Sequence, residues 1–249
     1  ALIDYTPYLL SDVHGVSRTL AARKQGNFNL DESRSAVYMA RSKAFVKNTE
    51  LEAVLTFKGA KPGKFVRQVS ADPYTVTVHM HHSLIQLPDD NYIPRKFNPQ
   101  SGFWSIEHKD YAAPLGESMY VRYIPRHRLA KKDPSLPISE PVEPIVYYLD
   151  PGVPEPVKSA LLEGGKWWND AFSAAGYKNA FIVKVLPTNV DPMDIRYNVI
   201  QWVHRATRGW SYGSSVIDPR TGEILKGHVT LGSLRVRQDI LIAEALAAP

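Results

Sequence analysis

The chain of 249 residues is 44% hydrophobic, and its 30 Lys and Arg against 25 Asp and Glu give a net charge of +5. This length permits one large domain or two small ones, and the charges are scattered singly, a pattern that does not predict a nucleic-acid-binding protein. The absence of cysteine excludes disulfides, thiolate nucleophiles and cysteine-ligated metal sites. No stretch approaches the roughly 18 apolar residues of a membrane span, and the N-terminus lacks the features of a signal peptide, so the compartment stays open.

The first part of the chain predicts a short helix followed by antiparallel strands. Leu9, Val13, Val16 and Leu20 recur at helical spacing before Gly26, which predicts one amphipathic helix. Alternating apolar residues then predict strands, separated by turns rich in Gly and Pro, over residues 35–40, 51–57 and 74–87. We expect this region to form a mostly antiparallel sheet.

A weakly regular stretch and a proline-rich linker follow. Residues 88–116 predict loops with a short strand at 103–106, and a further strand is expected at 119–124. Residues 126–144 carry a basic cluster and then four prolines, which can neither continue a helix nor pair centrally in a sheet. We therefore place the domain boundary here, with a strand-rich accessory domain at 1–142 and a second domain at 143–249.

The second domain predicts strand, helix, strands, hairpin and helix in that order. An apolar strand at 144–150 precedes a long helix that begins near Pro154 and ends at Gly176, a residue suited to a left-handed cap. One broad apolar face of this helix is expected to contain Val157, Leu161, Trp168, Ala171, Phe172 and Ala175. The remaining predicted elements are strands at 181–186 and 194–205, a hairpin over 210–233 with its turn at 218–222, and a helix after Ser233.

The chain contains no motif of a zinc-peptidase helix. Such a helix needs two histidines four residues apart with a glutamate beside the first, and none of the eight histidines is followed by glutamate. Glu163-Gly164-Gly165-Lys166 lacks the first glycine and the hydroxyl residue of a phosphate-binding loop. The sequence at 212–216 is not the nucleophile elbow of a serine hydrolase.

Three histidines cluster in the predicted strand at 74–87. Strand alternation places His79 and His81 on one face and His82 on the other. Two histidines at this spacing can share a metal, although the strand supplies no carboxylate as a third ligand. Half-exposed sheet histidines with ordinary packing roles are the favoured interpretation, and metal binding stays open.

Nucleic-acid binding is an unfavoured alternative. The basic cluster can contact phosphates and the tryptophans can stack on bases, yet the cluster falls in a predicted linker and two tryptophans fall in predicted packed elements. The residues concerned are Arg126, His127, Arg128, Lys131, Lys132, Trp167, Trp168, Trp202 and Trp210. We expect no nucleic-acid partner.

Seven phrases along the chain together resemble large bacterial zinc-dependent metalloproteases of the metzincin-like group. They are DYTPYLLSDVHGV, SRSAVYMARSKAF, NTELEAVLTF, HHSLIQLP, DYAAPLGE, RHRLAKKDP and GHVTLGSLRVRQDILIAEAL. The resemblance covers nearly all residues and implies a strand-rich accessory region followed by the first part of a metzincin-like catalytic domain. It implies that the HExxH helix and the downstream zinc ligand lie beyond Pro249, so no catalytic or metal-binding residue is carried over.

The resemblance does imply a place for substrate. Metzincins pair extended peptide with an exposed edge strand beside the cleft, and the matching segment here is the first arm of the hairpin, residues 210–217. The candidate substrate-binding residues are Trp210, Tyr212, Gly213, Ser214 and Ser215. An unpaired strand edge offers backbone donors and acceptors to a peptide. The small residues can equally mark a bulge or tight bend in an ordinary hairpin.

The sequence thus predicts an α+β protein whose accessory domain precedes a partial metzincin-like α/β subdomain. We expect a fragment of a secreted or periplasmic zinc endopeptidase, inactive alone, whose zinc is held by the intact parent. The expected partners are a peptide or protein substrate and the remainder of the catalytic domain. The alternative is a non-catalytic peptide-binding or regulatory module that uses the same sheet edge.

Overall fold

A computed structural model describes residues 2–205 and 210–247, which form two compact units, Ala1–Gln86 and Leu87–Pro249. The division lies well before the boundary expected within residues 126–144. That proline-rich stretch is held to the second unit by backbone bridges from Arg126 to Glu223 and from Ser139 to Tyr177. The prolines of this stretch predicted a linker. Its bridges to Glu223 and Tyr177 could not be predicted from local composition, because those partners lie far along the chain.

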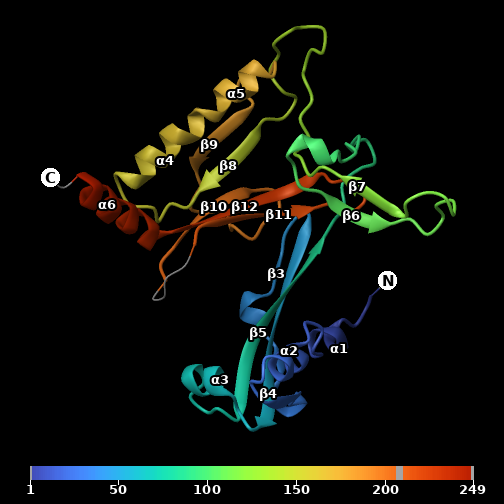
Figure 1. The fold of residues 1–249 in the computed structure, drawn as a ribbon, viewed down its shortest axis with the longest axis vertical. Helices are drawn as coiled ribbons and strands as arrows, with labels where there is room; N and C mark the ends of the chain where they lie inside the picture. The colour runs from blue at the N-terminus through green and yellow to red at the C-terminus, as the bar shows by residue number, and fades with distance from the viewer. Residues whose placement is uncertain (1, 206–209, 248–249) are drawn as a thin grey trace. The chain divides into compact units, whose positions relative to one another are not determined.

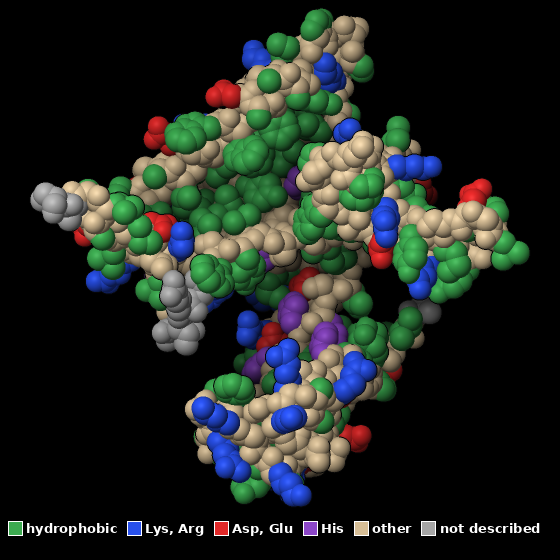
Figure 2. Space-filling view, viewed as in Figure 1, with side chains coloured by type: hydrophobic (Ala, Val, Ile, Leu, Met, Phe, Trp, Pro, Cys, Tyr) green, Lys and Arg blue, Asp and Glu red, His purple; other side chains and the backbone are tan. Residues whose placement is uncertain are grey.

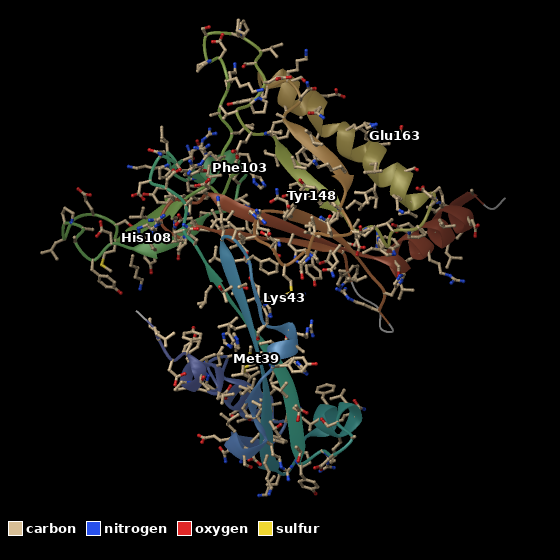
Figure 3. The ribbon with its side chains drawn as sticks, turned by 180° about the vertical axis from the view of Figure 1, so that it is seen from behind. Met39, Lys43, Phe103, His108, Tyr148 and Glu163 are labelled. Carbon is tan, nitrogen blue, oxygen red and sulfur yellow. The ribbon has the colours of Figure 1, made fainter. Side chains whose placement is uncertain are left out.

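The N-terminal unit is built on one long strand, β4 (Asn48–Ala60). Strand β5 (Thr75–Ile85) pairs with one edge of β4 along its whole length, antiparallel. Short strands share the other edge of β4, and all pair antiparallel as predicted: β1 (Asn27–Leu30), β2 (Ala36–Val37) and β3 (Lys43–Ala44). The 3-10 turns between them are η1 (Glu32–Arg34) and η2 (Met39–Arg41), and Figure 3 labels Met39 and Lys43 in this segment beside β4.

Two short helices replace the single N-terminal helix that was predicted. They are α1 (Thr6–Leu9) and α2 (Val16–Ala22), separated by a turn in which Gly15 has φ +65°. Asp12 accepts hydrogen bonds from the backbone N–H groups of Val16 and Ser17 and so begins a new helix there. The prediction of one helix was wrong because apolar spacing continues across this break.

Apolar side chains from one face of the β4–β5 pair form the core of the N-terminal unit. Ala53, Leu55 and Phe57 are fully buried there, and helix α3 (Lys64–Val69) adds Val66. Because side chains alternate along a strand, the even-numbered residues of β4 lie on the opposite face. That opposite face carries the polar cluster described below.

The C-terminal unit begins with loops, the turn η3 (Pro99–Ser101) and the hairpin of β6 (Ile106–Lys109) and β7 (Tyr120–Tyr123). Its main sheet has five strands in the order β11-β12-β10-β8-β9. Their bounds are Ile145–Leu149 for β8, Phe181–Val185 for β9, Asn198–Val203 for β10, Tyr212–Ile217 for β11 and Ile224–Gly232 for β12. Four of these strands are parallel, and β11 alone runs antiparallel to its neighbour β12.

Helices α4 (Val157–Lys166) and α5 (Trp168–Ala174) follow one another along this sheet beside β8 and β9 (Figure 1). The predicted single helix is thus divided at Trp167, which caps both helices. Phe172 stacks on Phe181 of β9 with ring centroids 5.9 Å apart, so this face of α5 packs as predicted. Trp168 was expected on the buried face but is 60% exposed. Gly176 ends the segment at φ +87°, as its predicted cap role requires.

The hairpin turn and the last helix complete the unit. Asp218 is fully buried, and its carboxylate accepts hydrogen bonds from the Arg220 backbone and guanidinium, while Gly222 supplies φ +82°. This is the turn that the sequence predicts. Helix α6 (Ser233–Ala247) begins directly after β12, and none of its residues is buried. The protein as a whole is a mixed α and β structure.

Candidate functional site

Strand β11 forms one edge of the five-stranded sheet and pairs with β12. The prediction of an edge strand in this segment therefore agrees with the sheet order. Tyr212, Gly213 and Ser214 are exposed and Ser215 is half-buried, whereas Trp210 precedes the strand. All five predicted residues thus lie on or directly beside this edge.

The backbone of β11 alternates between bonding to β12 and facing outward. Gly227, opposite Ser215, donates its backbone N–H to the Asn198 side chain of β10, 2.7 Å away. Gly227 therefore directs this N–H away from β11, and in an antiparallel ladder Gly213 and Ser215 then direct their backbone groups outward. Ser214 lies opposite His228 and bonds inward.

The register irregularity of this hairpin lies between Val216 and Ile217, beyond the small residues. The small residues at 213–215 are therefore not themselves the bulge. A Cβ added to Gly213 would have His228 O at 3.9 Å as its nearest contact, so the strand is accessible at this point. Small side chains here leave room for another backbone to approach.

Aromatic side chains flank the beginning of the edge. Tyr212 is 54% and Trp210 67% exposed. The Arg205 guanidinium donates to the Trp210 carbonyl at 3.1 Å and lies 5.4 Å from the centre of the Tyr212 ring. These contacts orient two exposed rings and one cation beside the outward-facing backbone.

A second polar cluster lies in the N-terminal unit, on the β4–β5 face opposite the apolar core. Glu50 and Glu52 are 4% and 2% exposed, and each accepts a hydrogen bond from an imidazole of β5. His79 Nδ1 lies 2.6 Å from Glu52 Oε1, and His81 Nε2 lies 2.5 Å from Glu50 Oε2. The same-face placement of His79 and His81 agrees with the prediction, and the carboxylates come from the neighbouring strand.

Further donors complete the environment of each carboxylate. Ser83 Oγ and Asn48 Nδ2 donate to Glu50, and Arg41 Nε lies 3.4 Å from Glu52 Oε2. Burial alone would raise the pKa of Glu52, but hydrogen bonds from the histidines and the charge of Arg41 outweigh burial and hold this pKa below its usual value. Both carboxylates are thus fully engaged by donors.

The geometry of this cluster favours a hydrogen-bonded network. Across residues 2–205 and 210–247, no three His, Cys, Asp or Glu side chains are arranged to hold a metal ion. Each imidazole instead bonds directly to a carboxylate. Sequence reasoning missed Glu50 and Glu52, although two glutamates at alternate positions of a predicted strand were a readable signal of one polar face.

His82 lies on the other face of β5, as alternation predicted. Its ring stacks on His14 with centroids 5.3 Å apart and meets Tyr8 edge-on at 5.6 Å. Its Nε2 atom is buried and has no hydrogen-bond partner among the described residues. Burial first, then the neighbouring His14 and His81, lower the pKa of His82.

The basic residues of 126–132 are engaged within their own unit. Arg128 forms paired hydrogen bonds of 2.8 Å to the buried Glu223 and also binds Asp89. Lys131 donates to the carbonyls of Leu136 and Pro137, and Lys132 pairs with Glu140 at 3.1 Å. These contacts account for the basic cluster as a structural feature.

No helix within the described ranges has the length and apolar character needed to cross a membrane. Residues 163–166, excluded above as a phosphate-binding loop, lie at the end of α4, and Figure 3 labels Glu163 on that helix.

Comparison with known proteins adds one match. A family model described as "Domain of unknown function (DUF5117)" matches residues 1–132, more than half of the chain. This match covers the N-terminal unit and ends within the predicted linker, before β8. No curated protein and no solved structure matches the chain. The protein therefore belongs to the DUF5117 family.

Proposed function

We propose that this chain is part of a zinc-dependent endopeptidase, in which residues 143–249 form the front of a metzincin-like catalytic domain and β11 pairs with extended substrate. The observation that carries this proposal is the position of β11. It is an antiparallel strand at the edge of an otherwise parallel sheet, and the backbone groups of Gly213 and Ser215 face outward. A peptide laid beside β11 would satisfy these groups as an added strand.

The order of elements supports the same proposal. Strand β8, helices α4 and α5, strands β9 and β10, the β11–β12 hairpin and helix α6 follow one another as the resemblance implies. Zinc in such an enzyme polarises the scissile carbonyl and lowers the pKa of a bound water. In this proposal its ligands and the general base belong to the remainder of the catalytic domain, so residues 1–249 alone are inactive.

One face of the sheet also supports a role for the remainder of the domain. Gly165 of α4 packs on Val183, which places the helices on the face that also carries Tyr147 and Leu149. Across that face, Ile200 and Val229 remain half-buried. Figure 2 shows hydrophobic side chains gathered over these strands beside α4 and α5. A further element of the catalytic domain would bury this surface.

The intact enzyme is proposed to be periplasmic or secreted and to act on peptide or protein substrates. The second candidate is a non-catalytic peptide-binding module. It is favoured by one observation, since the outward-facing backbone groups of β11 need no metal to pair with an extended peptide. The two candidate functions share the peptide-binding site at β11 and differ in whether the intact protein binds zinc.

Peptide binding provides the first test. An unstructured fluorescent peptide library is titrated against residues 1–249 in a chelator, with Ser215→Pro and Ser215→Ala compared. Proline removes the outward N–H of Ser215, so binding should fall at least tenfold, whereas alanine keeps that N–H and should bind like wild type. Equal peptide binding by all three proteins, or no binding by the wild type, would contradict the proposal that β11 binds peptide.

Zinc content separates the two candidates. Zinc per chain is measured by plasma mass spectrometry on residues 1–249 and on the longer protein encoded by the source gene, together with cleavage of an unfolded protein. Zinc and cleavage in the longer protein alone support the peptidase. Absence of zinc from both proteins, with peptide binding retained, supports the binding module. Stoichiometric zinc on residues 1–249 would point to the histidines of β5 and contradict the assignment of an incomplete catalytic domain.

A further inference from the structure

Strand β5 has a long edge without a backbone partner among the described residues. It pairs with β4 on one side, and no bridge is formed on its other side. At its two ends, Gly59 N–H donates to Tyr74 O and Gln86 N–H donates to Lys47 O, each at 2.9 Å. Even-numbered residues of β5 therefore bond to β4, and the backbone groups of the odd-numbered residues from Thr77 to Ser83 face outward.

This edge lacks the features that usually prevent strand pairing. Natural edges are blocked by proline, by charged side chains, by bulges or by shortness. β5 contains no proline, no Lys, Arg, Asp or Glu, and its pairing with β4 runs through eleven consecutive positions without a register shift. Its three histidines are its sole titratable side chains near neutral pH. Such an edge is open to a further strand.

The polar face of β5 is symmetrical about Met80 between residues 77 and 83, since Thr77 corresponds to Ser83 and His79 to His81. On the apolar face Val76 corresponds to Leu84 and Met80 meets its own copy, whereas Val78 lies opposite His82. Two copies aligned antiparallel about Met80 would therefore match polar residues along the polar face and leave the Val78–His82 pairs as the mismatch on the other face. The same alignment pairs the outward-facing backbone groups with each other.

We infer that two copies of this chain associate through their β5 edges, antiparallel and centred on Met80, to join their N-terminal sheets. The contact is isologous, because the same edge serves both partners and the two-fold axis closes the assembly as a dimer. A charged or proline-containing partner strand is disfavoured because the edge offers no complementary charge. This inference concerns the N-terminal unit and is independent of the function proposed for β11.

The association is tested by sedimentation velocity between about 1 and 100 µM. The wild type is expected to shift from monomer to dimer within this range. Thr77→Pro removes one outward N–H and leaves the bonds to β4 in place, so it should remain monomeric. Thr77→Val keeps that N–H and removes the hydroxyl that contacts Thr56 at 3.0 Å, so it should dimerise. Circular dichroism of all three proteins establishes that they are folded.

Engineered cysteines test the register, since the chain has none of its own. In the double variant Thr77→Cys, Ser83→Cys, each new thiol faces its counterpart from the other copy, and mild oxidation should give a covalent dimer. In Thr77→Cys alone the two thiols are separated by six strand positions, roughly 20 Å, and no cross-link should form. A monomeric wild type at 100 µM, a dimeric Thr77→Pro, or equal cross-linking of both cysteine variants would overturn the inference.

Discussion

The two main sheets of this protein bury different chemistry on their central strands. In the N-terminal unit, one face of β4 buries apolar side chains such as Leu55, while the opposite face buries Glu50 and Glu52. In the C-terminal unit, β8 and β10 bury Leu149 and Val199. A parallel sheet covered by helices is held by apolar contacts that need no particular partner, whereas the carboxylates of β4 depend on donors from β5. The N-terminal sheet is therefore the more sensitive to single polar substitutions.

Among substitutions that test this difference between the two sheets, Glu52→Gln is expected to have the largest effect on stability. A glutamine amide would direct an N–H donor at Arg41, whose guanidinium is itself a donor, and would leave a buried polar group unsatisfied. We expect a loss of about 2 kcal/mol in the free energy of unfolding, below the range for fully buried ion pairs because Arg41 is 63% exposed. Urea denaturation gives the total loss, and amide hydrogen exchange should place it in β4 and β5.

The matched control is Glu107→Gln on the β6–β7 hairpin. Glu107 pairs with Arg122 at 2.9 Å, with both side chains 48% exposed, so its loss should stay within about 0.5 kcal/mol. If both variants lose the same stability, the buried cluster contributes no more than a surface ion pair, and the contrast between the two sheets disappears.

The sheets also differ in how well the sequence predicted them. The apolar run at 145–149 predicted β8, because strands covered on both faces are continuously apolar, and the strand predicted at 181–186 corresponds to β9. Alternation predicted β4, β5 and the faces of the β5 histidines. The pairing of His79 with Glu52 was not predicted, because it depends on the register between β4 and β5, which the alternation within each strand does not determine. The division between α4 and α5 was missed because apolar spacing continues through Trp167.

The candidate edge came from the resemblance, which implies that the first arm of the hairpin pairs with extended peptide. The turn residues Asp218 to Gly222 predicted the hairpin itself. The direction of each backbone group, on which the Ser215→Pro test depends, required the hydrogen bond from Gly227 to Asn198. The free edge of β5 likewise could not be predicted from the sequence, because it depends on β5 pairing with no strand other than β4 in the described part of the chain.

An intermediate effect is expected from two adjacent glycines of α4. A Cβ at Gly165 would collide with the Val183 side chain of β9, whereas a Cβ at Gly164 would meet nothing within 4 Å. Gly165→Ala should therefore lose about 1–2 kcal/mol of stability through overpacking, and Gly164→Ala should gain about 0.5–1 kcal/mol through helix propensity. Thermal denaturation measures both. Equal gains in the two variants would show that α4 does not pack closely on β9 in solution.

The smallest effect concerns pH and His82. Burial and the nearby His14 lower the pKa of His82 in the folded state below its ordinary value of 6.5. The unfolded chain therefore takes up this proton first, so the stability associated with neutral His82 is complete above pH 6.5 and is lost as the pH falls below it. Tyr8 and His14 from the N-terminal segment face this ring and offer no carboxylate to balance a positive charge. Acidification should accordingly increase hydrogen exchange in α1 and α2 before it affects β8 to β12.

The control variant is His82→Phe, which keeps an aromatic ring against Tyr8 without a titrating group. In this variant the hydrogen exchange of α1 and α2, corrected for the intrinsic pH effect, should change less between pH 7 and 5 than in the wild type. An unchanged pH response in His82→Phe would show that other groups control the attachment of these helices, with the buried carboxylate Glu52 the next to test because its pKa is also shifted.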